Sequence, residues 1–248
     1  MEYVLITGGT SGIGFELAKN FAREGYGLVL VSSSGERLQE AKEKLEDEFK
    51  IKIRTYKQNL ASIGAAMQLY NRTKEDNLNI SILVNNAGIG LVGSTDEIDL
   101  QQDESMMILN IISVVELCKL YISDMYKQGQ GKILNVSSTG AFQPGPYTST
   151  YFASKAFVLS YSRAIRYESK AKGVQVCTLC PGATKTNFFA REGTKTPRSA
   201  MTAEEVAAYA YKRLMKNKDI IIPGIANIIK NCIPMKLRII FVAKLKKK

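Results

Sequence analysis

Tyr151 and Lys155 lie four residues apart in a segment whose apolar spacing predicts a helix, so both side chains share one helix face. A tyrosine hydroxyl has an ordinary pKa of about 10, which makes it a poor proton donor at neutral pH. A neighbouring ammonium group stabilises the phenolate and is expected to lower that pKa. Because the chain contains no histidine, this pair is the best proton-transfer group available, with Tyr151 as the acid or base.

An isolated Tyr/Lys pair is a common surface arrangement, so its neighbours in the sequence decide its meaning. Ser138 precedes Tyr151 by thirteen residues and follows an apolar run at residues 132–136. A glycine-rich turn at residues 7–14 follows another apolar run and precedes a helical pattern. Such a turn places backbone N–H groups and the positive end of a helix against a phosphate. Its glycine spacing resembles a nucleoside-triphosphate loop, but Phe15 and Glu16 replace the required Lys and Ser/Thr, which excludes a γ-phosphate site.

The absence of histidine also excludes a Ser-His-Asp triad and any metal site with histidine ligands. Cys177 and Cys180 have the spacing of a metal or redox pair, but they fall in a strand-like segment where buried thiols are common. Cys118 and Cys232 lie far away in the sequence. We therefore predict no metal site, no disulfide and a cytoplasmic location. The short apolar start of the chain, which leads directly into the glycine turn, does not resemble a signal peptide.

The net charge of +11 is concentrated at one end of the chain. Seven Lys and Arg residues follow Asp219 and no acidic residue does, which leaves a mildly basic body of +4 and predicts no nucleic-acid partner. Residues 225–248 form an apolar and basic extension. They are interpreted either as a pocket cover that also lies on an anionic membrane surface, or as an apolar helix packed on the body with solvated lysines.

Short apolar runs alternate with helical patterns along most of the chain. The predicted strands are residues 3–6, 27–31, 51–56, 80–84, 132–136, 174–179 and 220–222, and the predicted helices include 36–49, 62–75, 102–126, 150–171 and 203–215. This alternation predicts a single α/β domain at residues 1–224, a doubly wound Rossmann fold with a parallel sheet of about seven strands and helices on both faces. The turns at 7–14, 85–90, 137–145 and 181–187 should then meet in one crevice at the carboxyl ends of the strands.

These motifs, in this order and spacing, resemble the short-chain dehydrogenase/reductase family over about residues 1–190. The resemblance rests on the turn that begins at Thr7, the Asn85-Asn86-Ala87-Gly88 run, Asn110, Ser138, the Tyr151/Lys155 pair and Pro181-Gly182. It implies hydride transfer between a nicotinamide and a carbonyl or alcohol carbon, with Tyr151 as general acid or base. Lys155 would also bond the nicotinamide ribose, Ser138 would orient the substrate oxygen, and Asn110 would hold a water in a proton relay. Ser137 is the alternative to Ser138, and a purely structural role is the alternative for Asn110.

The same resemblance places a nicotinamide dinucleotide along the crevice. An acidic residue after the second strand favours NAD(H), whereas Ser32, Ser33 and Ser34 followed by Arg37 favour the 2′-phosphate of NADP(H). Ser11 is neutral, although many NADP-dependent members of the family carry a basic residue there. Asn59 replaces the Asp usual at its position. The cofactor-binding residues predicted in this way are Gly8, Thr10, Ser11, Gly12, Ile13, Gly14, Ser32, Ser33, Ser34, Arg37, Asn59, Leu60, Asn86, Ala87, Gly88, Tyr151, Lys155, Pro181, Gly182, Thr184 and Thr186.

The predicted activity is an NADP(H)-dependent oxidoreductase acting on a small or lipophilic carbonyl or secondary alcohol. Four aromatic residues, Phe142, Tyr147, Phe188 and Phe189, are expected to line its substrate pocket. The alternative is a nucleotide-binding regulatory or scaffold protein of the same fold without turnover. By resemblance, the predicted helices 102–126 and 150–171 would form the surface of a homodimer or homotetramer. The predicted location is the cytoplasm, with peripheral contact to a membrane through the C-terminal tail.

Overall fold

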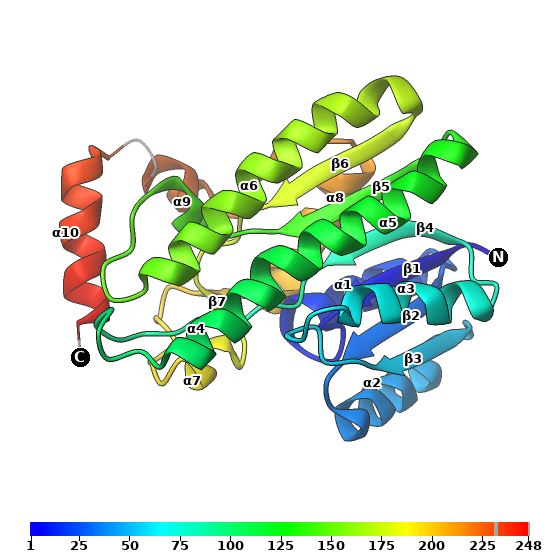
Figure 1. Ribbon diagram of the computed structural model, residues 1–248, viewed down its shortest axis with the longest axis horizontal. Helices are drawn as coiled ribbons and strands as arrows, with labels where there is room; N and C mark the ends of the chain where they lie inside the picture. The colour runs from blue at the N-terminus through cyan, green and yellow to red at the C-terminus, as the bar shows by residue number, and fades with distance from the viewer. Residues whose placement is uncertain (231–232, 248) are drawn as a thin grey trace.

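The seven principal strands form one parallel sheet in the computed structural model, which describes residues 1–230 and 233–247 (Figure 1). The sheet order is β3-β2-β1-β4-β5-β6-β9. The strands are β1 (Tyr3–Thr7), β2 (Gly27–Ser32), β3 (Ile53–Lys57), β4 (Ile80–Asn85), β5 (Gly131–Val136), β6 (Val174–Leu179) and β9 (Ile220–Ile221). The chain runs outward from β1 to β3 and then returns to β4 on the other side of β1, which is the strand reversal of a doubly wound fold. The predicted fold class is confirmed.

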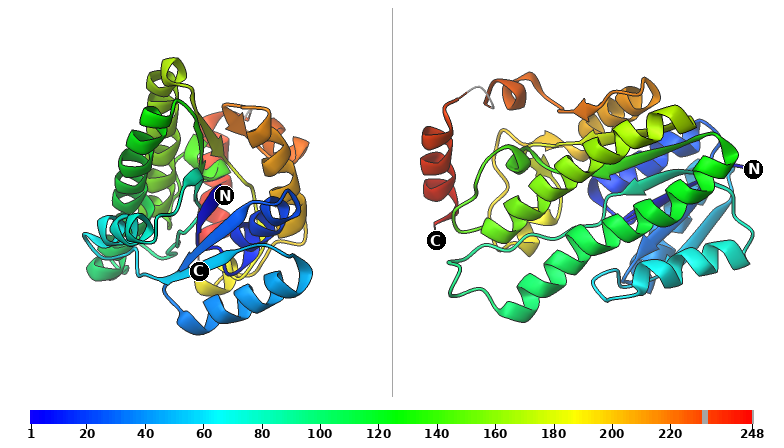
Figure 2. Two further views of the ribbon diagram at one scale, coloured as in Figure 1. Left: turned by 90° about the vertical axis from the view of Figure 1, so that its right-hand side faces the viewer. Right: turned by 45° about the horizontal axis from the view of Figure 1, so that its top comes forward.

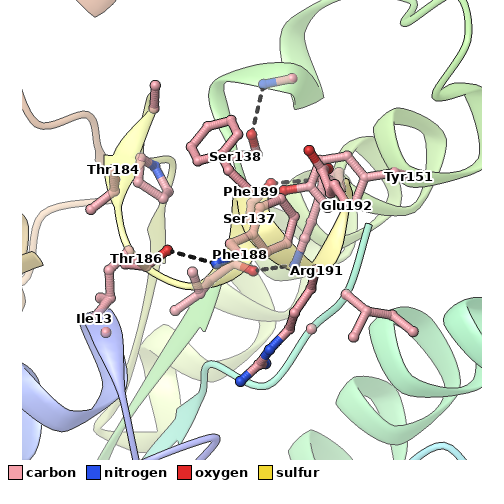
Figure 3. A pocket seen from close by; sticks show the side chains of 18 of the residues that line it. Ile13, Ser137, Ser138, Tyr151, Thr184, Thr186, Phe188, Phe189, Arg191 and Glu192 are labelled. Carbon is pink, nitrogen blue, oxygen red and sulfur yellow. Dashed lines mark hydrogen bonds between the residues drawn. The ribbon is translucent and has the colours of Figure 1, made fainter. Parts of the chain in front are cut away.

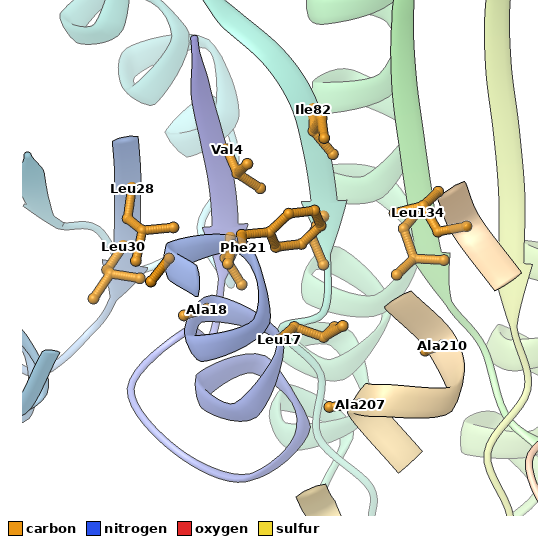
Figure 4. Close-up of a cluster of buried hydrophobic side chains, with 14 of the residues drawn as sticks. Val4, Leu17, Ala18, Phe21, Leu28, Leu30, Ile82, Leu134, Ala207 and Ala210 are labelled. Carbon is orange, nitrogen blue, oxygen red and sulfur yellow. The ribbon is translucent and has the colours of Figure 1, made fainter. Parts of the chain in front are cut away.

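Helices cover both faces of the sheet. On one face lie α1 (Gly12–Arg23), α2 (Gly35–Glu48) and α8 (Ala203–Met215), and on the other lie α3 (Ala65–Glu75), α5 (Ser113–Gln128) and α6 (Ser149–Ser169). Residues of β1 alternate between the two cores: Val4 and Ile6 face the first, and Leu5 faces the second. Figure 4 shows Leu17 and Phe21 of α1 packed between Val4 and the α8 residues. Burial of these apolar faces is the main force that holds the three layers together.

The long predicted helix at residues 102–126 contains an irregularity. The structure has α4 (Leu100–Met107), a π-helical turn (Ile108–Ile112) and then α5, all continuous. The segment Leu100–Gln128 is long and apolar enough to cross a membrane by length and composition. However, α5 packs against β4 and β5, and Asn110 in the π turn is fully buried, so this segment is a core helix of the fold.

Several element ends differ from the predictions. The predicted helix at 62–75 begins only at Ala65, because Gly64 has a left-handed backbone with φ of 78°. The predicted strand at 51–56 begins at Ile53 because Ile51 turns back to Phe49. Pro223 follows the short β9. A small two-stranded sheet, β7 (Thr184–Lys185) with β8 (Met201–Thr202), was not predicted, and neither was the one-turn helix α7 (Phe188–Arg191).

The C-terminal extension forms two helices, α9 (Ile225–Lys230) and α10 (Met235–Lys246). Figures 1 and 2 show α10 at the end of the molecule, beside the loops that follow β5 and β6 and far from the N-terminus. Its placement brings the C-terminal end of α10 to the same end of the molecule as the carboxyl ends of the strands. Cys232 lies outside the described residues.

Candidate active site

A cavity of about 780 Å³ opens at the carboxyl ends of the strands. Residues from all four predicted turns line it, which confirms that the turns after β1, β4, β5 and β6 meet in one crevice. Gly8, Asn86, Ser138 and Gly182 represent the four turns. The cavity lies beside β1 and β4, where the strand order reverses and where ligands bind in open α/β sheets.

The glycine-rich turn after β1 is shaped by close backbone contacts. Gly8 and Gly12 have φ of 65° and 56°, a conformation that other residues rarely adopt. A Cβ on Gly14 would lie 2.4 Å from Asn86 Nδ2, and one on Gly12 would lie 2.9 Å from Thr186 Cγ2. Ser11 is the N-cap of α1 but makes no side-chain capping hydrogen bond. The helix therefore presents its N-terminus to the cavity without a side-chain acceptor, as a phosphate site requires.

Asn86 joins this turn to β4. Its Nδ2 donates to the carbonyl oxygens of Thr7 and Gly8 at 2.9 and 3.1 Å. Thr7 Oγ1 in turn accepts from the backbone N–H groups of Asn86 and Ala87, both at 3.0 Å. These bonds hold the ends of β1 and β4 together and fix the shape of the cradle. The cavity thus has the narrow backbone fit and the helix N-terminus that a dinucleotide needs.

The far end of the cradle lies after β2. Ser32, Ser33 and Arg37 line the cavity there, together with Gln58 and Asn59, and no carboxylate is among the lining residues at this end. Ser34 instead serves as the N-cap of α2, and its Oγ accepts from the Arg37 backbone N–H at 3.3 Å. Ser34 and Gly14 are the predicted cofactor-binding residues that do not line the cavity. All the others do, including Thr10, Ile13, Leu60, Ala87, Gly88, Pro181 and Thr184.

Tyr151, Ser138 and Lys155 line the same cavity, where β5 ends and α6 begins. The Ser138 side chain lies close enough to the Tyr151 hydroxyl to lower the pKa of that phenol. Ser137 instead donates to the Lys155 carbonyl oxygen at 2.7 Å, so Ser138 is the serine that faces the phenol. Lys155 is buried, and its Nζ donates to the Val136 carbonyl oxygen at 3.0 Å and lies 5.9 Å from the centre of the Tyr151 ring. The three predicted groups are therefore together.

The predicted lowering of the Tyr151 pKa is wrong for this arrangement. Burial raises the pKa of the phenol, the nearby Ser138 side chain opposes that rise, and the Glu192 carboxylate adds to it. Burial also lowers the pKa of Lys155 to about 8, while Cys180 opposes that shift. The sequence showed the spacing of the pair but carried no information on how far the phenol is removed from water.

Asn110 lies behind this group of residues. Its Nδ2 donates to the Ile89 carbonyl oxygen at 2.9 Å and to Ser154 Oγ at 3.2 Å, and its Oδ1 accepts from the Ile89 backbone N–H. A Cβ on Gly88 would lie 3.1 Å from Asn110 Oδ1 and 3.2 Å from Lys155 Nζ, so these two atoms approach the same backbone position. The residue is held by the chain itself and does not line the cavity. Its role in a water relay remains a prediction.

The end of the cavity beyond Tyr151 is lined by residues of α7 and α10. Phe188 lies with its ring centre 5.5 Å from that of Tyr151, and Phe189 also lines the cavity (Figure 3). Two expected lining residues, Phe142 and Tyr147, do not: the Phe142 carbonyl oxygen accepts from Arg238, and the Tyr147 carbonyl oxygen accepts from Gly93. The interpretation of residues 225–248 as a pocket cover named no individual residues. Ile233 just before α10 and Leu237, Arg238, Phe241, Val242, Leu245 and Lys246 in α10 all line the cavity. Their i, i+4 spacing was the available signal.

Glu192 was also missed. It follows α7, its side chain is 1% exposed, and its Oε2 accepts from Lys246 Nζ at 2.8 Å. No metal site is found among the described residues, since no group of three His, Cys, Asp or Glu side chains converges. The described cysteines are free and buried, including Cys177 and Cys180.

The parallel sheet, the glycine cradle and the Ser-Tyr-Lys group together define a short-chain dehydrogenase. The family model of the short chain dehydrogenases matches residues 2–197, and the chain belongs to this family. The predicted family and enzyme class, an oxidoreductase of this type, are confirmed.

The similarity to individual relatives within the family is moderate, with about 30% of residues identical. The chain is 31% identical over 186 residues to the very-long-chain 3-oxoacyl-CoA reductase of Bos taurus, which covers 73% of this chain and 58% of that protein. It thus spans less than two thirds of that relative. Among solved structures, a short-chain dehydrogenase from Sphingobium yanoikuyae in complex with NADPH has a TM-score of 0.86 and 31% identity, covering 91% of this chain and 88% of that one. A bulky-bulky ketone specific alcohol dehydrogenase from Comamonas testosteroni has a TM-score of 0.82 and 28% identity, with 100% and 96% coverage.

Proposed function

We propose that the protein is an NADP(H)-dependent oxidoreductase that interconverts a lipophilic carbonyl compound and its secondary alcohol. The observation that carries the proposal is the common cavity: Ser138, Tyr151 and Lys155 line the same space as the glycine turn. The cradle residues would hold the dinucleotide, which supplies the hydride that the carbonyl carbon accepts. The residues of this chain then handle the oxygen atom.

In the direction of reduction, Tyr151 donates its proton to the carbonyl oxygen as the carbon receives the hydride. Ser138, which lines the cavity beside Tyr151, is placed to orient that same oxygen. The phenolate left on Tyr151 is stabilised by the Lys155 ammonium. Both residues lie on the same face of α6, and Lys155 Nζ lies 5.9 Å from the centre of the Tyr151 ring. Phe188 and Phe189 exclude water from this end of the cavity.

The preference for NADP(H) over NAD(H) rests on the residues after β2. Ser32, Ser33 and Arg37 line the cavity and offer hydroxyl donors and one cation to a 2′-phosphate. A carboxylate, which would bond the 2′-hydroxyl of NAD(H) and repel that phosphate, is missing from the described residues that line this end. The relative from Sphingobium yanoikuyae was solved with NADPH.

The lipophilic substrate is supported by the apolar residues at the other end. Phe188, Leu237, Phe241, Val242 and Leu245 line the cavity beyond Tyr151. Two relatives are named for large carbonyl compounds, a very-long-chain 3-oxoacyl-CoA and a bulky-bulky ketone.

A panel of 3-oxoacyl thioesters, bulky ketones and small ketones tests the proposal, with turnover measured as the loss of NADPH absorbance. Turnover of large carbonyl compounds by the wild type, lost in Tyr151→Phe while NADPH still binds, supports it. Unchanged turnover in Tyr151→Phe contradicts it, and a wild type that binds NADPH without turnover favours the non-catalytic alternative.

The C-terminal helices support peripheral membrane contact as part of this function. Nine of the eighteen exposed large apolar side chains among the described residues lie between residues 225 and 245, namely Ile225, Ile228, Ile229, Ile233, Met235, Leu237, Ile240, Phe241 and Leu245. Only basic charges accompany them. A second copy of this surface would bring like charges together, whereas an anionic lipid surface complements them.

Flotation with liposomes of anionic or neutral lipid tests this contact. Ile240→Glu and Lys244→Glu should each reduce flotation with anionic vesicles severalfold. Ile63→Glu and Lys44→Glu, which alter exposed residues in other parts of the fold, should leave it unchanged. Equal flotation of all variants contradicts membrane contact, and concentration-dependent self-association lost in Ile240→Glu identifies a second copy as the true occupant.

A further inference from the structure

The catalytic cavity contains a charged group that the proposed chemistry does not use. Glu192, directly after α7, has a side chain that is only 1% exposed. It lies against the Gly90 backbone, where a Cβ would come within 2.3 Å of Oε1. Figure 3 shows it beside Tyr151, and the two groups influence each other electrostatically. A carboxylate in such a place is costly unless a partner neutralises it.

The partner comes from the last turn of α10. Lys246 Nζ lies 2.8 Å from Glu192 Oε2, and the lysine side chain is 12% exposed. Thr194 Oγ1 donates to the same carboxylate at 3.3 Å. Oε1 is buried and makes no hydrogen bond with the described residues. Lys246 is therefore held inside the cavity by its ion pair with Glu192, and it is not one of the solvated lysines of the basic tail.

The position of this pair matters for the proton transfer. When Tyr151 gives its proton to the substrate oxygen, a phenolate forms near the Glu192 carboxylate, and like charges oppose one another. Three other cations surround the site: Lys155 on α6, Arg191 at the end of α7, and Arg238 on α10. Lys155 is bonded to the Val136 carbonyl oxygen and Arg238 to the Phe142 carbonyl oxygen. Of these four cations, Lys246 makes the ion pair with Glu192.

We propose that Glu192 and Lys246 are positioning residues for catalysis: the C-terminal helix supplies the cation that prevents a buried carboxylate from opposing the phenolate of Tyr151. The inference rests on the proposed function, because it concerns the proton that Tyr151 transfers. It makes α10 part of the electrostatic design of the site in addition to its role as an apolar wall.

The pH dependence of kcat/KM, measured for alcohol oxidation and for carbonyl reduction, reads this effect. Oxidation requires the phenolate, so its rate rises with pH through the pKa of Tyr151, and reduction requires the protonated phenol. In Lys246→Met the ascending limb of the oxidation profile, which follows the deprotonation of Tyr151, should move up by about 1 pH unit, because an unpaired carboxylate remains beside the phenol. Oxidation at neutral pH should then fall about tenfold, with reduction nearly unchanged.

Glu192→Gln should move the same limb down, because it leaves an unpaired cation. The double variant Glu192→Gln with Lys246→Met should return close to the wild type. Lys236→Met, another exposed lysine on the same helix that does not line the cavity, is the matched control. Melting of the NADPH-loaded protein gives a second readout without turnover: each single variant should lower Tm more than Lys236→Met does, and the double variant should recover part of the loss.

The outcomes separate this inference from the proposed function. A wild type without turnover on any carbonyl compound, or a Tyr151→Phe variant with full turnover, contradicts the function and the inference with it. An active wild type whose pH limb stays in place in both Lys246→Met and Glu192→Gln overturns the inference alone, even where Tm falls. The expected result is that the pH limb moves up in Lys246→Met and down in Glu192→Gln, and that the limb of the double variant lies between them.

Discussion

The two ends of the cavity are built by different means. The cofactor end depends on backbone: glycines at Gly8, Gly12 and Gly14, a helix N-terminus, and the Asn86 hydrogen bonds that join β1 to β4. The substrate end depends on side chains of α7 and α10, with aromatic packing in α7 and the Glu192–Lys246 ion pair beside it. A backbone cradle accepts almost no change at its glycines, whereas a wall of side chains can be altered one residue at a time. Cofactor use should therefore be rigid and substrate choice adjustable.

The largest effect is expected at the cradle. In Gly14→Ala the new Cβ would meet Asn86 Nδ2 at 2.4 Å and the Gly8 carbonyl oxygen at 2.5 Å, so the turn has to shift. We expect a loss of about 1–3 kcal/mol in the free energy of unfolding and a strong loss of NADPH affinity, measured by denaturation and by nucleotide fluorescence. Gly35→Ala is the control, since its nearest neighbour is the flexible Lys57 side chain at 3.7 Å. Equal behaviour of the two variants would show that the cradle is not tight.

An intermediate effect is expected where the cradle ends in side chains. Ser33→Asp introduces a carboxylate at the end of the cavity where the 2′-phosphate is proposed to bind. The ratio of kcat/KM for NADPH to that for NADH should fall by about tenfold or more, because a carboxylate beside the 2′-phosphate repels it. Ser34→Asp is the matched control: Ser34 caps α2, and aspartate caps a helix equally well. A ratio that is unaltered in Ser33→Asp argues against NADP(H) selection by this segment.

The smallest effect is expected at the side-chain wall. Phe241→Ala removes an apolar ring that lines the cavity from α10. KM should rise about tenfold for large carbonyl compounds, while small ketones, which do not reach α10, keep the wild-type KM. Ile240→Ala alters the adjacent residue, which does not line the cavity. A similar rise for small and large substrates would mean that the helix has moved, and would contradict a local contact with the substrate.

The same contrast explains how much the sequence could predict. The strands, the cradle and the Ser138-Tyr151-Lys155 group follow from local patterns and fixed spacings, because each depends on neighbours in the chain. The substrate end depends on contacts such as Lys246 with Glu192, which are separated by 54 residues. Nothing in either local segment marks these two as partners. For the same reason the direction of the Tyr151 pKa shift was missed, since burial is produced by the packed molecule and not by the i, i+4 pair.

The π turn at Ile108–Ile112 carries a consequence for how the long helix is phased. A π turn holds more residues than an α turn, and one additional residue rotates everything beyond it by about 100° around the helix axis. A regular helix over residues 102–126 therefore has the correct length, but on one side of Asn110 it points the side chains in the wrong direction around the helix axis. Deleting a single residue within this turn would restore a regular helix, and would turn either the apolar stripe of α5 away from the sheet or Asn110 away from Ile89. The π turn therefore lets the apolar residues of α5 face the sheet while Asn110 faces Ile89, although these two directions differ.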